Sequence, residues 1–441
     1  MIRVTLITLG CPKNQVDSEY MESMLKNEFK IVKNSEEAEV IIINTCGFIE
    51  DAKQESIDTI LEAARYKEEG NCRALIVTGC LTQRYKEKII NEIPEIDAIL
   101  GTGNFDKIVT TVKKVLTGDK VNKIDSPDFD YRYDLPRNIT NNHYTYIKIA
   151  EGCNNNCSYC AIPNIRGKVK SRPIEDIYKE IKNLNQTNIK EIILIAQDIT
   201  QYGIDIYNDS ALVSLLEKIV SLDNIKWIRL LYSYPERITQ QLINLIKNES
   251  IICNYLDLPI QHSSNKIRKK MGRKGKRKEI IDLINTLRTE IEDISIRTSL
   301  IVGFPGETEK DFQDLKKFIK KIKFDRLGVF KYSREEGTAA ANFNDQISSE
   351  IKEKRYDEIM KIQQEISLQK NKQYIGKNIQ VLIDEIYKDY AVGRSQYDAP
   401  EIDNQIIIYN TELKPGDLIK CKITDAYEYD LIGEEINEFT K

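Results

Sequence analysis

Residues 151–173 read EGCNNNCSYCAIPNIRGKVKSRP and contain three of the nine cysteines of the chain. Cys153, Cys157 and Cys160 form the pattern C-x3-C-x2-C, which would arise by chance in this chain with a probability of only about 0.004. A structural zinc site is one interpretation, but zinc takes four ligands, and no His or Cys follows at a suitable spacing. Three thiolates instead predict a 4Fe–4S cluster with one iron left open, because Cys thiolates are the usual ligands of such clusters.

The chain around this stretch alternates between apolar, strand-like segments and helical patterns over residues 143–345. The predicted strands are Tyr144–Ala150, Glu191–Ala196, Trp227–Leu231, Tyr255–Leu258, Ile294–Ile301 and Leu327–Phe330. Six such βα units predict a partial barrel rather than the full eight-stranded form. The cysteine triplet follows the first strand, at the edge where such folds place their chemistry.

Residues 1–118 show the same alternation and predict a parallel sheet with helices on its faces. The predicted strands are Val4–Leu9, Val40–Asn44, Ala74–Thr78 and Ala98–Leu100. Cys11, Cys46 and Cys80 each follow the end of one of these strands. The carboxyl ends of parallel strands meet at one edge, so we expect a second three-cysteine site there. Three separate buried thiols are the alternative, since free Cys is among the most buried residue types.

The remaining segments complete the predicted domain organisation. Residues 119–142 are polar, carry two prolines and predict a linker. A charged helical connector over residues 346–375 leads into residues 376–441, where short β-like pieces and turns predict a small β-barrel. The predicted fold class is therefore α/β, with an N-terminal parallel-sheet domain, a central partial (β/α)6 barrel and a C-terminal β-barrel.

The composition of the 441-residue chain excludes several classes of protein. Two histidines are too few for multi-histidine zinc sites, and a formal net charge of −4 excludes a protein that is basic overall. No apolar run approaches about 18 residues, so no membrane span is expected. Nine scattered cysteines do not suit a secreted disulfide scaffold, and the N-terminus does not look like a signal peptide. We therefore expect a cytoplasmic protein.

The complete pattern resembles the methylthiotransferase family of radical S-adenosylmethionine (SAM) enzymes. The resemblance covers nearly the whole chain, includes all six cysteines of the two sites, and makes the terminal barrel similar to a TRAM domain. Its local signatures are GCPKNQVDSE (10–19), EGCNNNCSYCAIPNIRGKVKSRP (151–173), PIQHSS (259–264), IVGFPGETE (301–309), KYSREEGT (331–338) and GRSQYDAPEID (393–403).

This resemblance implies two 4Fe–4S clusters and SAM as cofactors. The cluster on the catalytic cysteines of the central domain would bind SAM and cleave it reductively, and the resulting radical would remove a hydrogen atom from the substrate. The cluster of the N-terminal domain would hold the sulfur that is transferred. Further SAM contacts are expected at the predicted catalytic edge of the barrel, with turn formation as the alternative role. These residues are Gln197, Asp198, Gly303 and Glu307.

The family has one branch that modifies a tRNA adenosine and another that modifies the β-carbon of an aspartate in small-subunit ribosomal protein twelve. Residues 11–14 (CPKN), 334–338 (REEGT) and 398–403 (DAPEID) resemble the second branch. Charge favours the same interpretation, since residues 376–441 hold seven Lys and Arg against 14 Asp and Glu, a net charge of −7. A domain that binds tRNA phosphates should be basic, whereas an acidic barrel suits a basic ribosomal protein. The acidic residues expected to dock this protein include Asp398, Glu401 and Asp403.

Two other functions stay open from the sequence: a tRNA adenosine methylthiotransferase and a non-catalytic iron–sulfur protein. Residues 266–278 (KIRKKMGRKGKRK) contain nine Lys or Arg and could contact RNA or form a solvated surface. The resemblance also implies an electron donor such as flavodoxin and a monomeric enzyme. The sequence does not distinguish free ribosomal protein from the assembled ribosome as substrate.

Overall fold

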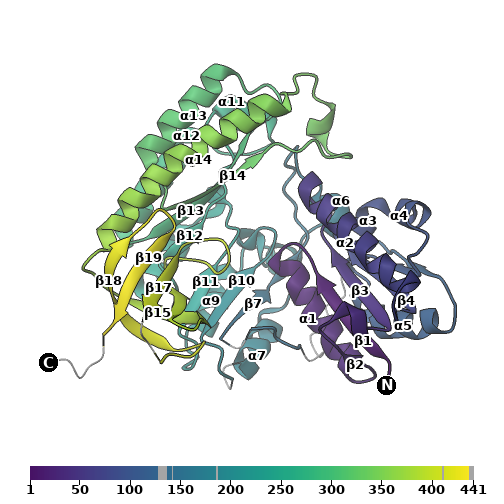
Figure 1. Ribbon diagram of the computed structural model, residues 1–441. Coiled ribbons are helices and arrows are strands. Elements are labelled where there is room, and N and C mark those ends of the chain that lie inside the picture. Colours follow the sequence, from purple (N-terminus) through teal and green to yellow (C-terminus); the bar gives the residue numbers. More distant parts are fainter. Residues whose placement is uncertain (128–136, 142, 185–186, 410–411, 437–441) are drawn as a thin grey trace.

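The structure is a computed structural model that describes residues 1–127, 137–141, 143–184, 187–409 and 412–436. Three units follow one another along the chain, as the colours of Figure 1 show. Part of the predicted linker, residues 128–136 and residue 142, lies outside the described residues.

Six parallel strands form the sheet of the N-terminal unit, in the order β2-β1-β3-β4-β5-β6. Their bounds are β1 Arg3–Thr8, β2 Lys30–Ile31, β3 Val40–Thr45, β4 Ala74–Gly79, β5 Ala98–Leu100 and β6 Val121–Lys123. All residues of β3, β4 and β5 are buried, as expected for strands that are covered on both faces. The four predicted strands are confirmed, whereas the short edge strands β2 and β6 were not predicted. β6 lies within the segment that was predicted to be a linker.

Helices cover both faces of this sheet. α1 (Pro12–Lys26) and α5 (Ile108–Leu116) share one hydrophobic core with the sheet, while α2 (Glu50–Glu68), α3 (Cys80–Tyr85) and α4 (Glu87–Glu92) share the other. The chain therefore leaves β1 toward one face and the neighbouring strand β3 toward the opposite face. Such a reversal creates the crevice in which open α/β sheets bind ligands.

Six parallel strands also line the central unit and confirm the predicted partial barrel. They are β7 Tyr144–Lys148, β10 Glu191–Ile195, β11 Trp227–Leu230, β12 Tyr255–Asp257, β13 Ser295–Val302 and β14 Arg326–Lys331. They form two ladders, β7-β10-β11 and β12-β13-β14, which a parallel bridge between Ile228 and Ile252 connects. Helices cover the outside of the strands: α7 Ile174–Leu184, α9 Leu212–Ile219, α10 Gln240–Asn248, α12 Arg277–Glu290, α13 Glu309–Ile322 and α14 Ser349–Asn371.

The C-terminal unit is a closed five-stranded barrel with the order β15-β16-β17-β19-β18. Its strands are β15 Asn378–Ile386, β16 Tyr390–Arg394, β17 Gln405–Tyr409, β18 Leu418–Ala426 and β19 Asp430–Glu435. β16 and β19 were not predicted, because Gly393, Arg394 and Gly433 interrupt their apolar patterns. Arg394 is buried, where it pairs with Glu191 at the start of β10.

Buried ion pairs attach the terminal barrel to the amino-terminal ends of the central strands. The Asp398 carboxylate lies 2.5 Å from Arg326 of β14, and Asp403 lies 3.3 Å from Arg297 of β13. The side chains of Asp398 and Asp403 are only 1% and 2% exposed, so the expectation that they dock a partner is wrong. Their negative charges form ion pairs between two units of the same chain. Glu401 is exposed and accepts a hydrogen bond from a tyrosine hydroxyl of β7.

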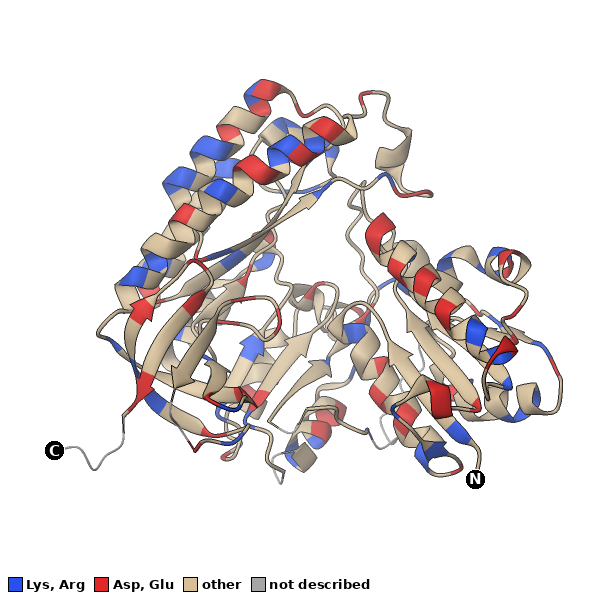
Figure 2. Cartoon of the chain, viewed as in Figure 1, with Lys and Arg blue, Asp and Glu red and all other residues tan. Residues whose placement is uncertain are grey.

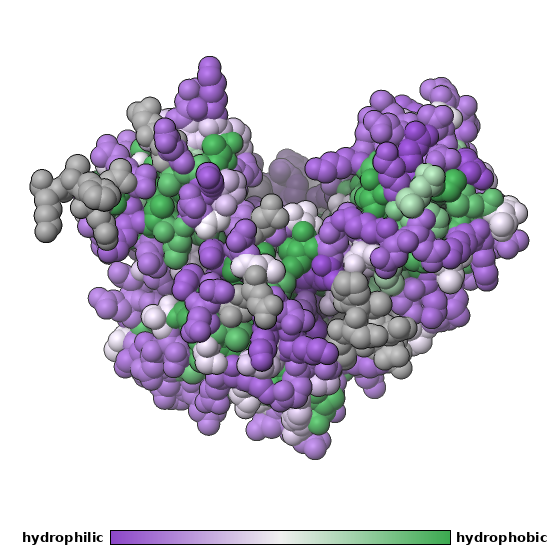
Figure 3. All heavy atoms as spheres, turned by 90° about the horizontal axis from the view of Figure 1, so that it is seen from below, coloured by the Kyte–Doolittle hydropathy of each residue, from purple (hydrophilic) through white to green (hydrophobic). Residues whose placement is uncertain are grey.

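No helix in the described ranges is long and apolar enough to cross a membrane. Seen from below, the surface is mostly hydrophilic and its apolar areas are small and separate (Figure 3).

Candidate active site

The first cysteine triplet lies on the loop between two short antiparallel strands, β8 (Ala150–Glu151) and β9 (Lys170–Ser171). This hairpin directly follows β7, so the loop stands at the carboxyl edge of the barrel strands. Cys153, Cys157 and Cys160 are all half-buried there. The structure therefore brings the predicted triplet to the predicted edge.

Two glycines allow the loop to pack closely against its surroundings. Gly152 has φ +70°, and a Cβ atom there would lie 2.0 Å from the Lys168 carbonyl oxygen. Gly272 approaches from the other side with φ +71°, and its Cβ would lie 2.5 Å from the Asn156 carbonyl oxygen. Any larger residue at either position would displace the loop.

Asp198, which follows β10, organises this loop. Its carboxylate accepts hydrogen bonds from Asn155 Nδ2 (2.8 Å), Gln201 Nε2 (2.9 Å) and Arg237 Nη1 (2.8 Å). Gln201 also donates to Cys153 Sγ at 3.5 Å, and the Asn155 backbone N–H donates to the same sulfur at 3.4 Å. Asp198 thus has a supporting role, and its contact with SAM stays a prediction. Sequence reasoning missed Gln201 and Arg237, although Gln201 follows the same strand.

Burial opposes the formation of thiolates at the first site. Burial and, to a smaller extent, the neighbouring thiols of Cys157 and Cys153 raise the pKa of the Cys160 thiol to about 12. Burial also raises the pKa of Cys153. Three adjacent thiols can be held as thiolates together only by a metal centre or similar cation. Within the described ranges no three His, Cys, Asp or Glu side chains are already arranged around a metal position, so ligation requires these thiols to turn toward a common centre.

The second triplet converges at the crevice of the N-terminal sheet. Cys11 precedes α1, Cys46 follows β3, and Cys80 is the first residue of α3. Gly10 has φ +89°, and a Cβ there would lie only 2.7 Å from Cys46 Cβ. Burial and, to a smaller extent, the thiols of Cys11 and Cys46 raise the pKa of Cys80 to about 12, although the Arg166 guanidinium opposes this rise. Cys11, Cys46 and Cys80 therefore act on one another electrostatically at this crevice, and a shared cluster on them stays a prediction.

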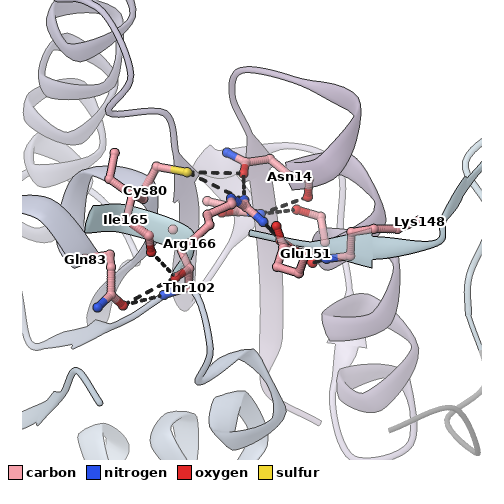
Figure 4. Close-up of polar contacts among 12 residues, drawn as sticks. Asn14, Cys80, Gln83, Thr102, Lys148, Glu151, Ile165 and Arg166 are labelled. Carbon is pink, nitrogen blue, oxygen red and sulfur yellow. Dashed lines mark hydrogen bonds and ion pairs between the residues drawn. The ribbon is translucent and has the colours of Figure 1, made fainter. Parts of the chain in front are cut away.

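Arg166 connects the two sites (Figure 4). It ends α6 (Ile162–Arg166), directly after the first cysteine triplet, and is only 1% exposed. Its guanidinium donates to Cys80 Sγ at 3.5 Å and to Asn14 Oδ1 at 2.5 Å, and lies 2.9 Å from Glu151. One side chain thus contacts a cysteine of the second site and the hairpin that carries the first.

The charges around Arg166 are balanced within the chain. Lys148 pairs with Asp17 and, at 2.8 Å, with Glu151, while Arg166 pairs with Asp17 at 3.2 Å. Burial raises the pKa of Glu151, but Arg166 and Lys148 lower it to about 2. Gln197 donates to Glu151 at 2.6 Å. Its predicted contact with SAM remains a prediction, and the structure shows it supporting this network.

Gly303 and Glu307 lie together beyond the end of β13. The Gly303 N–H donates to Glu307, whose carboxylate also pairs with Arg355 of α14 at 3.1 Å and lies 3.4 Å from His262 Nε2. A Cβ on Gly303 would lie 2.3 Å from Lys352 Cγ. These residues hold the loop against α14. Their contact with SAM stays a prediction.

A second ionic contact joins the N-terminal unit to the edge of the central barrel. Glu335 lies 2.6 Å from Arg84 and 3.1 Å from Lys53, and all three side chains are largely buried. Burial raises the pKa of Glu335, but hydrogen bonds from Ser333, Arg84 and Lys53 hold it below its ordinary value. Arg84 also donates to the Gly47 carbonyl oxygen, beside the second cysteine site. The two strand edges therefore face one another across fixed contacts.

Three protein-family models match successive parts of the chain. Residues 3–101 match the uncharacterized protein family UPF0004, residues 147–319 match the radical SAM superfamily, and residues 375–436 match the TRAM domain.

Solved structures of low sequence identity share the fold. The radical S-adenosylmethionine methyltransferase TsrM from Kitasatospora setae, with cobalamin and a 4Fe-4S cluster bound, superposes with a TM-score of 0.57 at 13% identity over 77% of each chain. The cobalamin-dependent S-adenosylmethionine radical enzyme OxsB gives a TM-score of 0.53 at 12% identity, over 82% of this chain and 56% of that chain. At this identity the similarity shows the fold alone.

Curated relatives are far more similar and match from end to end. A protein of Clostridium botulinum strain Langeland is 53% identical over 449 aligned positions, which cover 100% of this chain and 99% of the relative. A protein of Clostridioides difficile strain 630 is 49% identical, covering 99% of this chain and 100% of the relative. Both carry the name ribosomal protein uS12 methylthiotransferase RimO. The chain therefore belongs to the RimO family of radical SAM methylthiotransferases.

Proposed function

We propose that this protein adds a methylthio group to the β-carbon of an aspartate of ribosomal protein uS12, using SAM and two 4Fe–4S clusters. The observation that carries the proposal is the pair of three-thiol sites on two facing strand edges, connected through Arg166. The name of the end-to-end relatives supports uS12 as the substrate. The six cysteines of both sites come from one chain, which supports a monomer, and a substrate made in the cytoplasm supports a cytoplasmic enzyme.

The cluster ligands in this proposal are the six cysteines of the two sites. They are Cys153, Cys157 and Cys160 for the cluster that binds SAM, and Cys11, Cys46 and Cys80 for the second cluster. When bound, the first cluster and SAM supply a radical that can remove hydrogen from an unactivated carbon, and the second cluster supplies the sulfur.

The protein's own residues hold the two sites in position and exclude water. Gln201 and the Asn155 backbone orient Cys153, and Arg166 favours the thiolate form of Cys80. The buried ion pairs of Arg166 and Glu151 fill the space between the units with fixed charges instead of solvent. A rigid, dry arrangement of this kind suits radical chemistry, because it suppresses competing reactions.

The test of this function is the identity of the modified macromolecule. A strain that lacks the gene should lose the methylthio mass on uS12 and regain it when the gene is restored, as measured by mass spectrometry of ribosomal proteins and of digested tRNA. Restoration with the catalytic triplet replaced by Ala should fail. Loss of methylthioadenosine from tRNA with unchanged uS12 would instead establish the tRNA enzyme.

A basic surface beside the first site suggests how electrons enter. Figure 2 shows many Lys and Arg on the helices over the central barrel. Within residues 266–278, four exposed lysines have no ion pair among the residues that the structure describes: Lys269, Lys274, Lys276 and Lys278. The same segment contacts the cluster loop, since Ser158 N donates to the Met271 carbonyl oxygen at 3.0 Å. We infer that an acidic electron-transfer protein such as flavodoxin docks on these four lysines, because opposite charges steer association.

Replacing the four lysines by Gln tests this docking. The ratio of the SAM-cleavage rate with reduced flavodoxin to the rate with dithionite should fall several-fold, because dithionite needs no docking surface. The matched control replaces four exposed lysines of α13 by Gln: Lys310, Lys317, Lys320 and Lys321. An unchanged ratio, together with weaker binding to ribosomal RNA, would assign this surface to RNA instead.

A further inference from the structure

Lys13 carries a buried amino group without a carboxylate partner among the described residues. It lies in the first turn of α1, between Cys11 and Asn14, and is 7% exposed. Its Nζ lies 3.3 Å from the centroid of the Tyr232 ring, and it makes no hydrogen bond or ion pair within the described part of the chain. A buried charge is costly unless it is paired, so this position is suited to an anion supplied from outside the chain.

The neighbouring carboxylates already form ion pairs with other cations. Asp17 and Glu151 pair with Lys148 and Arg166, as described above. Asp257 pairs with Arg297 at 3.1 Å, and its second oxygen accepts the Tyr232 backbone N–H at 3.0 Å. Lys13 therefore has no carboxylate partner of its own among the described residues; burial lowers its pKa, and the Cys11 thiol is the strongest countercharge near it.

Tyr232 is held under Lys13 by a strained backbone. Its φ is +65°, a left-handed conformation that is unfavourable for a residue other than glycine. Two hydrogen bonds fix it, from its own N–H to Asp257 and from the Ile199 N–H to its carbonyl oxygen at 3.1 Å. Strain of this kind concentrates at binding and catalytic sites. Tyr232 follows β11 at the carboxyl edge of the barrel, so the ammonium lies between the two facing strand edges that carry the cysteine sites.

We propose that Lys13 receives the side-chain carboxylate of the substrate residue and selects an acidic side chain over its amide. This inference rests on the proposed function and deepens it. The Tyr232 ring covers one side of the Lys13 amino group. No hydrogen bond within the described residues uses its N–H groups, and such groups bond most strongly to a charged acceptor. The carboxylate carbon is bonded directly to the β-carbon, so binding the carboxylate also positions the hydrogen that must be removed. An adenine base has no negative charge that would pair with a buried ammonium.

The test compares binding of two proteins, recombinant uS12 and uS12 with its target aspartate replaced by Asn. Affinities are measured with the cluster-loaded enzyme and SAM, without reductant, so that no turnover occurs. The unmodified enzyme should prefer uS12 by tenfold or more, and this preference should disappear in Lys13→Met. Lys26→Met is the matched control, since Lys26 ends the same helix, is exposed and pairs with Glu22; it should keep the preference.

The ratio of the two affinities decides the outcome, because a loss of fold or of a cluster weakens both complexes alike. Lys13→Gln is the second variant if Lys13→Met is not recovered folded, and the same loss of preference is expected. Equal affinities in the unmodified enzyme, or an unchanged preference in the variants, would overturn the inference. If neither form of uS12 binds while tRNA becomes methylthiolated, the proposed function fails first and the role of Lys13 fails with it.

Discussion

The Arg166 guanidinium lies 3.5 Å from Cys80 Sγ, although the two residues belong to different units of the chain. The same guanidinium lowers the pKa of Cys80 and lies 2.9 Å from Glu151, next to the first cysteine loop. A change at Arg166 therefore affects both sites at once. This coupling follows from fixed, buried contacts and needs no conformational change.

Replacing Arg166 by Met should strongly destabilise the contact between the first two units. Asp17 and Glu151 would share only Lys148, and leaving buried charge unpaired costs about 3–5 kcal/mol. We expect the thermal midpoint of the metal-free protein to fall by several degrees, measured by circular dichroism. Arg65→Met, an exposed change on α2, should leave the midpoint within about one degree. An equal midpoint for both variants would contradict this account of the network.

Glu335 should make stability depend on pH under acidic conditions. Its pKa is held below the ordinary value of 4.5, so the unfolded chain binds more protons than the folded protein as the pH drops below that value. The stabilisation is present above about pH 4.5 and is lost as the pH falls through the lower, folded-state pKa. Glu335→Gln should therefore show a smaller loss of stability than the unmodified protein between pH 5 and pH 3.

The matched control for this measurement is Glu336→Gln. Glu336 is the next residue and is exposed, so its removal should leave the pH dependence as it is. If Glu335→Gln and Glu336→Gln show the same dependence of stability on pH, the ionic contact with Arg84 and Lys53 does not cause the acid sensitivity.

The fold could be predicted well wherever burial produces a clear sequence pattern. β3 and β4 are fully buried apolar runs, and both were found, as were all six strands of the central barrel. The missed strands β2 and β6 have two and three residues, which is too short to produce a period. Edge pairing depends on neighbours in space, so a local pattern cannot reveal it.

The site was predictable through its cysteines and much less through its supporting residues. The cysteine spacing indicated the first triplet and the strand ends indicated the second, because both signals are local in the sequence. The Arg84–Glu335 contact spans 251 residues and the Arg166–Cys80 contact spans 86, so no spacing rule could have paired them. The prediction that Asp398 docks a partner was wrong for a related reason. The net charge of the terminal barrel counts this carboxylate but does not show that it lies buried against Arg326.

Two clusters should be measurable separately. Replacing Cys153, Cys157 and Cys160 by Ala should halve the iron of the reconstituted protein and abolish reductive SAM cleavage to 5′-deoxyadenosine. The corresponding change at the other triplet should also halve the iron, but should leave that cleavage and abolish methylthio transfer. Loss of all iron in the first variant, or full transfer by the second, would contradict two independent sites with different tasks.

The terminal barrel should dock uS12 through its exposed acidic residues rather than through Asp398 or Asp403. Glu385 and Asp389 are exposed around the β15–β16 turn, beside the exposed Tyr387. Reversing both charges to Lys should weaken uS12 binding several-fold at low salt, because uS12 is basic, and the difference should shrink as the Debye length falls toward about 8 Å at physiological ionic strength. Surface plasmon resonance with immobilised uS12 measures this directly.

The matched control for the docking surface reverses two exposed acidic residues of α2, Glu55 and Glu62, on the N-terminal unit. It changes the net charge of the protein by the same amount, so equal weakening by both pairs would show that only overall charge matters. Weakening confined to the Glu385 and Asp389 pair would instead locate the docking surface at the opposite end of the central strands from the cysteine sites. A docked uS12 must then extend along the central barrel to bring its aspartate to the facing strand edges.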